Sequence, residues 1–275
     1  MNGQAHREFF AKLMAAQAGV SADSTLAAAF AATPREKFLG PPPWKAFTRS
    51  GYIEMVAGDP SLLYQDIVVS LGKGQINNGQ PSLHAVCLAA LKPQPGESAV
   101  HVGAGLGYYT ALLARLVGES GGVDAYEIDA ELAAKAQANL ADLSQVNVHA
   151  ASGAEGTLPE CDVLYVNASA THPLVAWLNA LRPNGRLLFP LAPENGPGAM
   201  LLIGHREDGS YSARFLMPVQ FIPCTGAQDD DTSAKLAGAF RLGNLGEVKS
   251  LHRNNSPDDT AWFAGSGWWL STRNP

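Results

Sequence analysis

A glycine-rich turn is the feature of this 275-residue sequence with the clearest chemical meaning. It reads Gly103-Ala104-Gly105-Leu106-Gly107 and stands between a short apolar run and a helical pattern. Glycines let a backbone approach a ligand closely, and the N-terminus of the following helix offers unpaired N–H groups to an anion. The turn therefore predicts a nucleotide-type pocket, whose anion is either a pyrophosphate or a methionyl carboxylate.

The spacing of the glycines separates two cofactors. A dinucleotide fingerprint would continue as Gly-x-Gly-x-x-Gly, but Tyr108 takes the place of the last glycine and, with Tyr109, would crowd a pyrophosphate. Glu127, 24 residues after Gly103, can accept hydrogen bonds from the ribose hydroxyls of either cofactor. The glycine spacing therefore carries the choice, and we expect S-adenosyl-L-methionine.

Strands that alternate with helices must position this turn. The expected strands are 98–102, 123–128, 146–150, 163–166 and 186–190. The expected helices between them are 109–117, 130–143 and 173–181. This alternation implies right-handed crossovers, so the predicted fold class is α/β, with a doubly wound and mostly parallel sheet.

The flanking segments follow other patterns. Before the sheet, we expect helices around 9–14, 26–32 and 82–91, and a loop rich in Gly, Asn and Gln over 72–81. After it, we expect a hairpin of 199–205 with 211–217, a helix over 233–240, and strands over 248–252 and 262–270. The predicted organisation is N-terminal helices with a substrate or lid loop (1–92), an α/β cofactor-binding domain (93–224) and a small α+β C-terminal extension (225–275).

Two further strand ends offer contacts to the cofactor. At the end of the third strand, Gly153, Ala154 and Glu155 would lie near the adenine, because ligands of open α/β sheets bind at the carboxyl edge. Asn167 closes the fourth strand as a polar residue after an apolar run, so it is either a ligand contact or a residue that caps the loop. The sequence leaves both interpretations open.

Composition argues against several classes of function. A formal net charge of −6 without a basic cluster speaks against broad nucleic-acid binding, and no run approaches the ~20 apolar residues of a membrane helix. Cys87, Cys161 and Cys224 lie far apart and lack CxxC spacing, and no secretory signal is visible, so we expect reduced thiols and a cytoplasmic protein. The histidines show no short ligand spacing, and we expect no metal.

The order of several short motifs resembles the protein-L-isoaspartate O-methyltransferase family over residues 25–223. The motifs are Pro34-Arg35-Glu36-Lys37-Phe38, Tyr64-Gln65-Asp66, Gly74-Gln75, Gln80-Pro81-Ser82-Leu83-His84-Ala85, the glycine turn with Tyr108, Tyr126-Glu127-Ile128, 181–187 with Pro190, and Phe221-Ile222-Pro223. The resemblance implies a Rossmann-like methyltransferase fold with an N-terminal helical lid. It also implies transfer of a methyl group from S-adenosylmethionine to the side-chain carboxylate of an isoaspartyl residue in damaged protein.

The resemblance assigns site residues as well. The residues implied for catalysis and substrate placement are Asn78, Gly79 and Gln80. The residues implied for the cofactor are Gln80, Leu83, His101, Gly103, Ala104, Gly105, Gly107, Tyr108, Glu127, Ile128, Gly153, Ala154, Glu155 and Asn167. The implied partner is a protein or peptide that carries a carboxylate acceptor.

Three positions depart from the family's pattern. The family has a Thr-Ile-Ser segment whose hydroxyl helps to place the substrate carboxylate, whereas Gly79 stands in the serine's place, after what reads as one inserted residue. One of the two preceding asparagines could donate the hydrogen bond instead. His101 replaces an acid that organises the methionine end of the cofactor, and is either functional or a strand histidine satisfied by backbone. Ala154 replaces an aspartate that faces the adenine, for which Glu155 can substitute.

The sequence shows no obvious general base, and several functions are compatible with this. A carboxylate acceptor has an ordinary pKa of ~4 and is already ionised near neutrality, so the lack of an obvious His–Asp or Ser–His pair does not argue against catalysis. His84 is interpreted as an ordinary residue of the lid helix, and Asp66 as one of several candidates for substrate contact. The alternatives are a methyltransferase with a different acceptor, a non-catalytic cofactor-binding protein and, most distantly, a nicotinamide dehydrogenase.

Overall fold

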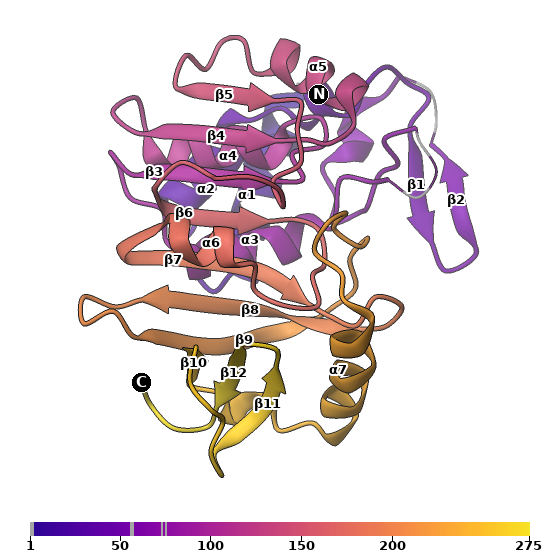
Figure 1. Ribbon diagram of the computed structural model, residues 1–275. Coiled ribbons are helices and arrows are strands. Elements are labelled where there is room, and N and C mark those ends of the chain that lie inside the picture. Colours follow the sequence, from indigo (N-terminus) through magenta and orange to yellow (C-terminus); the bar gives the residue numbers. More distant parts are fainter. Residues whose placement is uncertain (1–2, 56–57, 73, 75) are drawn as a thin grey trace. The chain divides into compact units, whose positions relative to one another are not determined.

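The computed structural model describes residues 3–55, 58–72, 74 and 76–275 (Figure 1). The chain divides into two compact units. Unit 1 comprises Met1–Glu97 and Ala104–Ala151, and unit 2 comprises Ser98–Gly103 and Ser152–Pro275. One passage of the chain between the units therefore falls inside the glycine turn. The organisation into three sequence segments stays a prediction.

Unit 2 is built on a sheet whose centre is parallel. Its strand order is β3 (Ser98–Val102), β6 (Cys161–Val166), β7 (Leu181–Leu191), β8 (Gly198–His205), β9 (Tyr211–Val219), β10 (Ser250–Arg253), β12 (Trp268–Ser271) and β11 (Ala261–Gly265). The pairs β3–β6 and β6–β7 are parallel, with α6 (Val175–Ala180) connecting the second pair, whereas all later pairs are antiparallel. The parallel strands are almost continuously apolar and buried, as strands covered on both faces are.

Unit 1 holds a further parallel pair. The elements are α4 (Tyr108–Val117), β4 (Gly122–Tyr126), α5 (Ala130–Asn139) and β5 (Val146–His149), and β4 pairs with β5. Asp129 caps α5, because its Oδ1 accepts hydrogen bonds from the N–H groups of Glu131 and Leu132 at 2.9 and 3.0 Å. The prediction that this helix reaches residue 143 is wrong. Leu140 leaves the helical conformation as the C-cap while its side chain is buried in the core.

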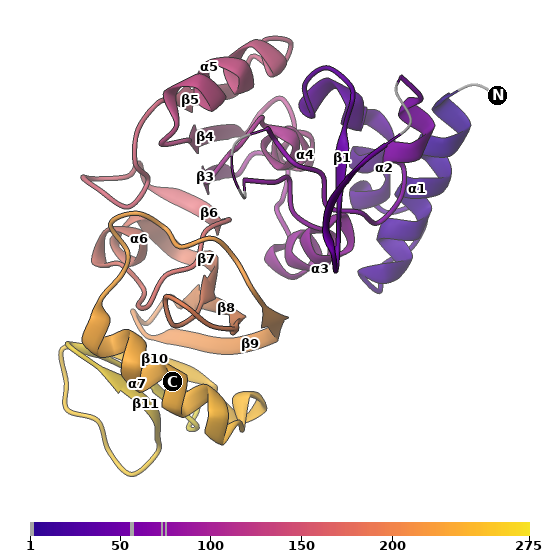
Figure 2. The same cartoon turned by 90° about the vertical axis from the view of Figure 1, so that its right-hand side faces the viewer.

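The N-terminal part of unit 1 is mainly helical, as predicted. Its elements are α1 (Gly3–Gln17), α2 (Thr25–Ala32), the 3₁₀ helix η1 (Arg35–Phe38), β1 (Lys45–Thr48), β2 (Gly51–Glu54), η2 (Pro60–Leu63) and α3 (Pro81–Leu91). Helices α1 and α2 pack against each other (Figure 2). The β1–β2 hairpin has no counterpart in the sequence-based expectations. Its strands are only four residues long and do not alternate strictly between apolar and polar residues.

A buried arginine holds the segment that leads into the predicted lid loop. Arg35 is completely buried, and its guanidinium donates to the carbonyl oxygens of Leu63, Gln65 and Ile67. The same guanidinium lies 5.4 Å from the centre of the Phe10 ring. Arg35 therefore fixes residues 63–67 to the helical core. Within the loop expected over 72–81, Lys73 and Gln75 lie outside the described residues.

The C-terminal extension continues the sheet of unit 2. It comprises α7 (Asp230–Leu242), η3 (Leu245–Glu247) and strands β10 to β12, and β10 pairs with both β9 and β12. The prediction of a single strand over 262–270 is wrong. The chain reverses near Gly267, whose φ is +76°, and forms the antiparallel β11–β12 hairpin.

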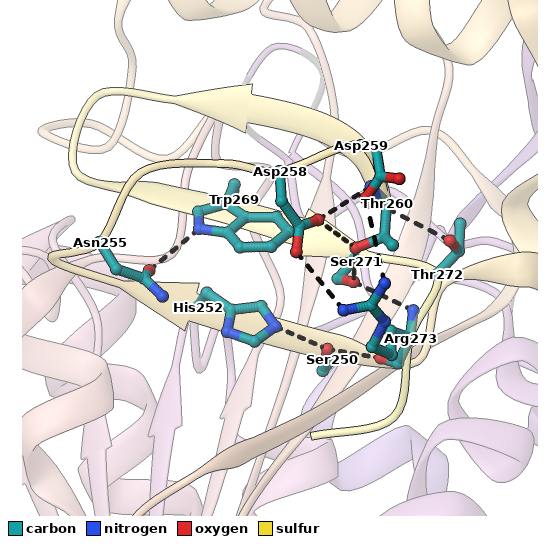
Figure 3. A network of polar contacts seen from close by, with 10 residues as sticks. All are labelled: Ser250, His252, Asn255, Asp258, Asp259, Thr260, Trp269, Ser271, Thr272 and Arg273. Carbon is teal, nitrogen blue, oxygen red and sulfur yellow. Dashed lines mark hydrogen bonds and ion pairs between the residues drawn. The ribbon is translucent and has the colours of Figure 1, made fainter.

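Polar contacts fasten the end of this extension (Figure 3). The His252 ring stacks on Trp269 with ring centres 4.2 Å apart, and Nε2 of His252 lies 3.0 Å from Ser250 Oγ. Ser250 Oγ donates in turn to the carbonyl oxygen of Arg273 at 2.7 Å, while the Arg273 guanidinium lies 3.7 Å from Asp258. The Ser250 hydroxyl thus links the backbone at Arg273 to strand β10.

The predicted fold class is confirmed, because the structure is α/β with a parallel sheet centre. The element boundaries also differ around Leu181, where the predicted helix over 173–181 gives way to β7. This strand begins earlier than the expected 186–190 and contains an irregularity between its pairs with Cys161 and Val163. No helix among the described residues has the length and apolarity needed to cross a membrane.

Candidate cofactor and substrate site

The glycine turn is folded so that side chains are excluded from it. Gly105 and Gly107 have φ angles of +56° and +93°, the left-handed region that favours glycine. A Cβ on Gly107 would come within 2.7 Å of Leu140 Cδ1, and a Cβ on Gly103 would lie 3.5 Å from atoms of Asn167. The backbone of the turn is therefore bare, as a close approach to a ligand requires.

Ala104 and Tyr108 complete the turn. The Ala104 N–H donates to the Tyr126 carbonyl oxygen at 3.1 Å, which ties the turn to the end of β4. Tyr108 begins α4, and its ring packs edge-on against Phe30 and Phe38 in the core of unit 1. The Tyr108 ring is thus part of the hydrophobic core, and only the backbone of Tyr108 is available to a cofactor.

Glu127 closes the turn through its carboxylate. Oε2 accepts a hydrogen bond from the Gly105 N–H at 2.7 Å, and Oε1 accepts one from the Asp129 N–H at 3.0 Å. Burial raises the pKa of Glu127, and these two N–H donors oppose that shift. Each carboxylate oxygen still has a second acceptor position for a ribose hydroxyl. Beside it, the Ile128 side chain is 54% exposed, an apolar surface that suits an adenine ring.

His101 and Asn167 meet at the ends of two neighbouring strands of unit 2. The Asn167 amide nitrogen Nδ2 lies 2.7 Å from His101 Nε2, and the Asn167 N–H donates to the Val102 carbonyl oxygen at 2.8 Å. His101 is completely buried, and this burial lowers its pKa to about 3. The imidazole is therefore neutral near pH 7.

The segment 153–155 follows in the same unit. A Cβ on Gly153 would lie 2.6 Å from Val102 Cγ2, so glycine is required for the loop to pass the end of β3. The Gly153 carbonyl oxygen accepts a hydrogen bond from Trp177 Nε1 at 2.8 Å, which fixes this passage. Glu155 is exposed and its side chain lies beside Gly226, whereas the half-buried Ala154 has no polar group to offer.

The predicted substrate loop is stabilised by its own asparagines. Asn78 Oδ1 accepts the Val69 N–H at 2.7 Å, and Asn77 Oδ1 accepts the Gly79 N–H at 2.9 Å. The amide nitrogen Nδ2 of Asn78 is buried and has no hydrogen-bond partner among the described residues. The role of Asn78 in binding the acceptor stays a prediction.

A histidine fills the space next to Gly79. A Cβ on Gly79 would lie 2.1 Å from His84 Nε2, and the φ of Gly79 is +68°. The His84 ring is itself stacked on Tyr109, with ring centres 3.6 Å apart and an angle of 15° between the planes. A serine at position 79 would therefore collide with the imidazole. The interpretation of His84 as an ordinary helix residue misses this coupling to the loop.

Asp66 organises the start of the lid helix α3. Its carboxylate accepts hydrogen bonds from the N–H and Oγ of Ser82 at 2.8 and 2.6 Å and from Gln80 Nε2 at 2.8 Å. The Gln80 side chain is therefore engaged with Asp66, while Leu83 lies half-buried in the first turn of the helix. Asp66 was one of several candidates for substrate contact, and its partners show a positioning role. Its distance in sequence from Ser82 explains why no local motif could indicate this role.

The described residues thus group the predicted site into two sets. The set within unit 1 comprises Asn78, Gly79, Gln80, Leu83, Ala104, Gly105, Gly107, Tyr108, Glu127 and Ile128. The set within unit 2 comprises His101, Gly103, Gly153, Ala154, Glu155 and Asn167. No group of three or more His, Cys, Asp and Glu within the described part of the chain could hold a metal ion.

A parallel α/β sheet, a bare glycine turn and a strand-end acid that closes it define a nucleotide-type cofactor site, and Tyr108 in place of the last glycine of a dinucleotide fingerprint makes it that of an S-adenosylmethionine-dependent methyltransferase. The sequence matches the model of the family described as protein-L-isoaspartate(D-aspartate) O-methyltransferase over residues 5–229. The chain belongs to this family, so the sequence-based assignments of family, cofactor and enzyme class are confirmed.

Individual relatives agree. A protein-L-isoaspartate O-methyltransferase of Anaeromyxobacter dehalogenans (strain 2CP-1 / ATCC BAA-258) is 36% identical over 168 residues, which cover 59% of this chain and 78% of that protein. A solved protein-L-isoaspartate O-methyltransferase structure has a TM-score of 0.68 at 22% identity, covering 90% of this chain and 73% of the other. A similar structure from Plasmodium falciparum, in complex with S-adenosyl-L-homocysteine, has a TM-score of 0.63 at 18% identity over 80% and 98% of the two chains.

Proposed function

We propose that the chain transfers the methyl group of S-adenosylmethionine to the side-chain carboxylate of an isoaspartyl residue in a protein or peptide. The observation that carries this proposal is the glycine turn closed by the carboxylate of Glu127, in a chain whose family match also includes the substrate loop. The three cysteines are free thiols, which supports a reducing compartment such as the cytoplasm.

The cofactor fits the residues of the turn. Gly105 and Gly107 leave the backbone bare, Glu127 keeps acceptor positions for ribose hydroxyls, and the exposed Ile128 offers an apolar surface to adenine. Within unit 2, Gly153, Ala154 and Glu155 are the residues expected near the adenine. When bound, S-adenosylmethionine supplies a methyl group on a sulfonium, which a nucleophile can take in an in-line displacement.

The acceptor side needs hydrogen-bond donors rather than a base. A carboxylate is ionised near neutrality, so catalysis consists of proximity and orientation. Asn78 Nδ2 is the buried donor that can hold one oxygen of the acceptor, while Gly79 and Gln80 shape the loop around it. Burial raises the pKa of Tyr109 well above its ordinary value, so this hydroxyl stays neutral and is no base.

The deciding experiment measures transfer of a labelled methyl group to an isoaspartyl peptide. The matched control is the same peptide with ordinary aspartate, and binding of S-adenosylhomocysteine is measured in parallel. We expect label in the isoaspartyl peptide alone, and the label should leave in mild base as a methyl ester does. Cofactor binding without transfer to the peptide would refute the proposed acceptor and leave the methyltransferase assignment intact.

A second candidate keeps the chemistry and changes the acceptor. The observation in its favour is the His84 ring, which lies where a side chain at position 79 would be. Position 79 thus has the His84 imidazole of α3 beside it in place of a hydroxyl, so an acceptor of different shape could bind better. A screen of carboxylate-bearing peptides and small acids with labelled cofactor separates the two candidates.

A further inference from the structure

Two polar side chains stand together in the apolar strand ends of unit 2. His101 on β3 and Asn167 directly after β6 belong to parallel neighbouring strands, and Nδ2 of Asn167 lies 2.7 Å from Nε2 of His101. The backbone of Asn167 is fixed as well, because its N–H donates to the Val102 carbonyl oxygen at 2.8 Å. The amide is thus held at both its backbone and its side chain.

The direction of the hydrogen bond determines what Asn167 offers. An amide nitrogen only donates, so His101 Nε2 must accept and carries no proton. Burial lowers the pKa of His101 to about 3, so the ring keeps this accepting role at physiological pH. The other end of the amide, the carbonyl oxygen Oδ1, has no hydrogen-bond partner among the described residues and is covered from solvent. Buried polar atoms are normally paired, and an unpaired one calls for an explanation.

The position of Asn167 points to the cofactor. A Cβ on Gly103, the first glycine of the turn, would lie 3.5 Å from the backbone and Cβ atoms of Asn167. Ligands of open α/β sheets bind at the carboxyl ends of the strands, which is where both residues stand. A residue that merely capped the loop would use its oxygen to accept a backbone N–H, and Asn167 Oδ1 does not.

The chemistry of the cofactor selects the group that pairs with this oxygen. The methionyl carboxylate of S-adenosylmethionine only accepts hydrogen bonds, whereas its ammonium group only donates. We propose that Asn167 Oδ1, oriented by His101, accepts a hydrogen bond from the methionyl ammonium. The cofactor's amino group is then recognised by a neutral amide and not by a carboxylate. The inference rests on the function proposed above, because it assumes that the turn binds this cofactor.

The test compares how tightly the chain binds a set of ligands that lack different parts of the amino-acid end of the cofactor. Isothermal titration compares S-adenosylhomocysteine, its analogue without the amino group, its analogue without the carboxylate, and 5′-methylthioadenosine, which lacks the amino-acid end. For the wild-type chain we expect removal of the amino group to weaken binding by about tenfold or more, the value of a hydrogen bond to a charged group. In Asn167→Leu, which has a similar volume, this difference should shrink to within about twofold.

Two variants keep the outcome interpretable. Asn167→Asp retains the accepting oxygen and adds a charge, and His101 must then donate from Nε2, because a carboxylate only accepts. This variant should preserve or increase the preference for the amino-bearing ligands and also serves if the leucine variant does not fold. His101→Gln retains an acceptor for the Asn167 amide and should leave the preference within about threefold of wild type.

The outcomes separate this inference from the proposed function. If neither S-adenosylhomocysteine nor 5′-methylthioadenosine binds the wild-type chain, both are refuted. If both ligands bind and Asn167→Leu leaves the amino-group preference unchanged, the role of Asn167 is refuted while the proposed function stands. If Asn167→Leu instead abolishes the difference in affinity between ligands with and without the carboxylate, the amide presents its nitrogen to the ligand. That result also overturns the inference.

Discussion

Glu127 and Asn167 are two strand-end groups of opposite construction. Glu127, in unit 1, is a carboxylate whose two oxygens already accept backbone N–H groups, one of them from the glycine turn. Asn167, in unit 2, is a neutral amide whose nitrogen is held by an imidazole and whose oxygen is unpaired. The Glu127 carboxylate is stabilised by hydrogen bonds from backbone N–H groups, one of them in the glycine turn. The Asn167 amide is instead held by the side chain of His101. Loss of the first should therefore disturb the turn, and loss of the second should remove one contact.

The largest effect is expected for Glu127→Ala. This variant loses the acceptor of both ribose hydroxyls, two hydrogen bonds of about 1.5–3 kcal/mol each, so affinity for S-adenosylhomocysteine should fall by about a hundredfold or more. Isothermal titration measures this loss. Glu131→Ala, which removes an exposed carboxylate of the same unit, is the matched control and should bind normally. A loss of less than tenfold would place the ribose elsewhere.

Gly107→Ala tests how much the conformation of the glycine turn, which Glu127 closes, contributes to the free energy of unfolding. The substitution combines a left-handed φ, costing about 1–2 kcal/mol, with overpacking against Leu140, costing about 1–3 kcal/mol. Urea unfolding should show a loss of about 2–5 kcal/mol for this variant. Gly209→Ala, at a φ of +82° with nothing within 4 Å, should lose only the conformational part. Equal losses in the two variants would show that the contact with Leu140 relaxes.

His101 makes the neutral group sensitive to acid. Its pKa falls from 6.5 to about 3 on folding, so the unfolded chain binds a proton that the folded chain excludes. The stabilising contribution is complete above pH 6.5 and is lost as the pH falls toward 3, with a slope of about 1.4 kcal/mol per pH unit. Urea unfolding of wild type and His101→Gln at several pH values isolates this contribution. Parallel curves would mean that His101 is protonated in the folded chain.

The smallest effect is expected for Tyr109→Phe, which asks whether an unpaired buried atom always indicates a ligand. The Tyr109 hydroxyl is buried without a partner, yet its ring is committed to stacking on His84. Removing the hydroxyl should change stability by less than about 0.5 kcal/mol and leave cofactor affinity unaltered. Tyr64→Phe is the contrasting control, since the Tyr64 hydroxyl donates to Glu36, and should cost about 1 kcal/mol. A large loss of cofactor affinity in Tyr109→Phe would make this hydroxyl a ligand group as well.

The features that could be predicted are those that depend on residues close together in the sequence. The glycine turn and the strand–helix alternation are local patterns, and the position of Glu127 follows from the spacing of the first two strands. The same reasoning could not show that Glu127 accepts the Gly105 N–H, because that contact depends on how the turn folds back over the strand end.

Contacts between distant segments were beyond prediction. The coupling of Gly79 to His84 becomes visible only when the loop and the first turn of α3 are placed together. The β1–β2 hairpin lacks strict alternation, and the β11–β12 hairpin was mistaken for one strand although Gly265, Ser266 and Gly267 offer a turn signal between its strands. In both hairpins, pairing between strands decides the structure more than the residues of either strand alone.

The capping of α3 by Asp66 has a consequence for how the family's substrate loop can change. Hydrogen bonds between Asp66 and Ser82 close the chain between them into a ring, so its two ends stay together whatever its length. The entropy of such a closure grows only with the logarithm of ring size, and one more residue in a ring of this size costs about 0.05 kcal/mol. Evolution can therefore lengthen or rewrite this loop without moving the helix that follows it.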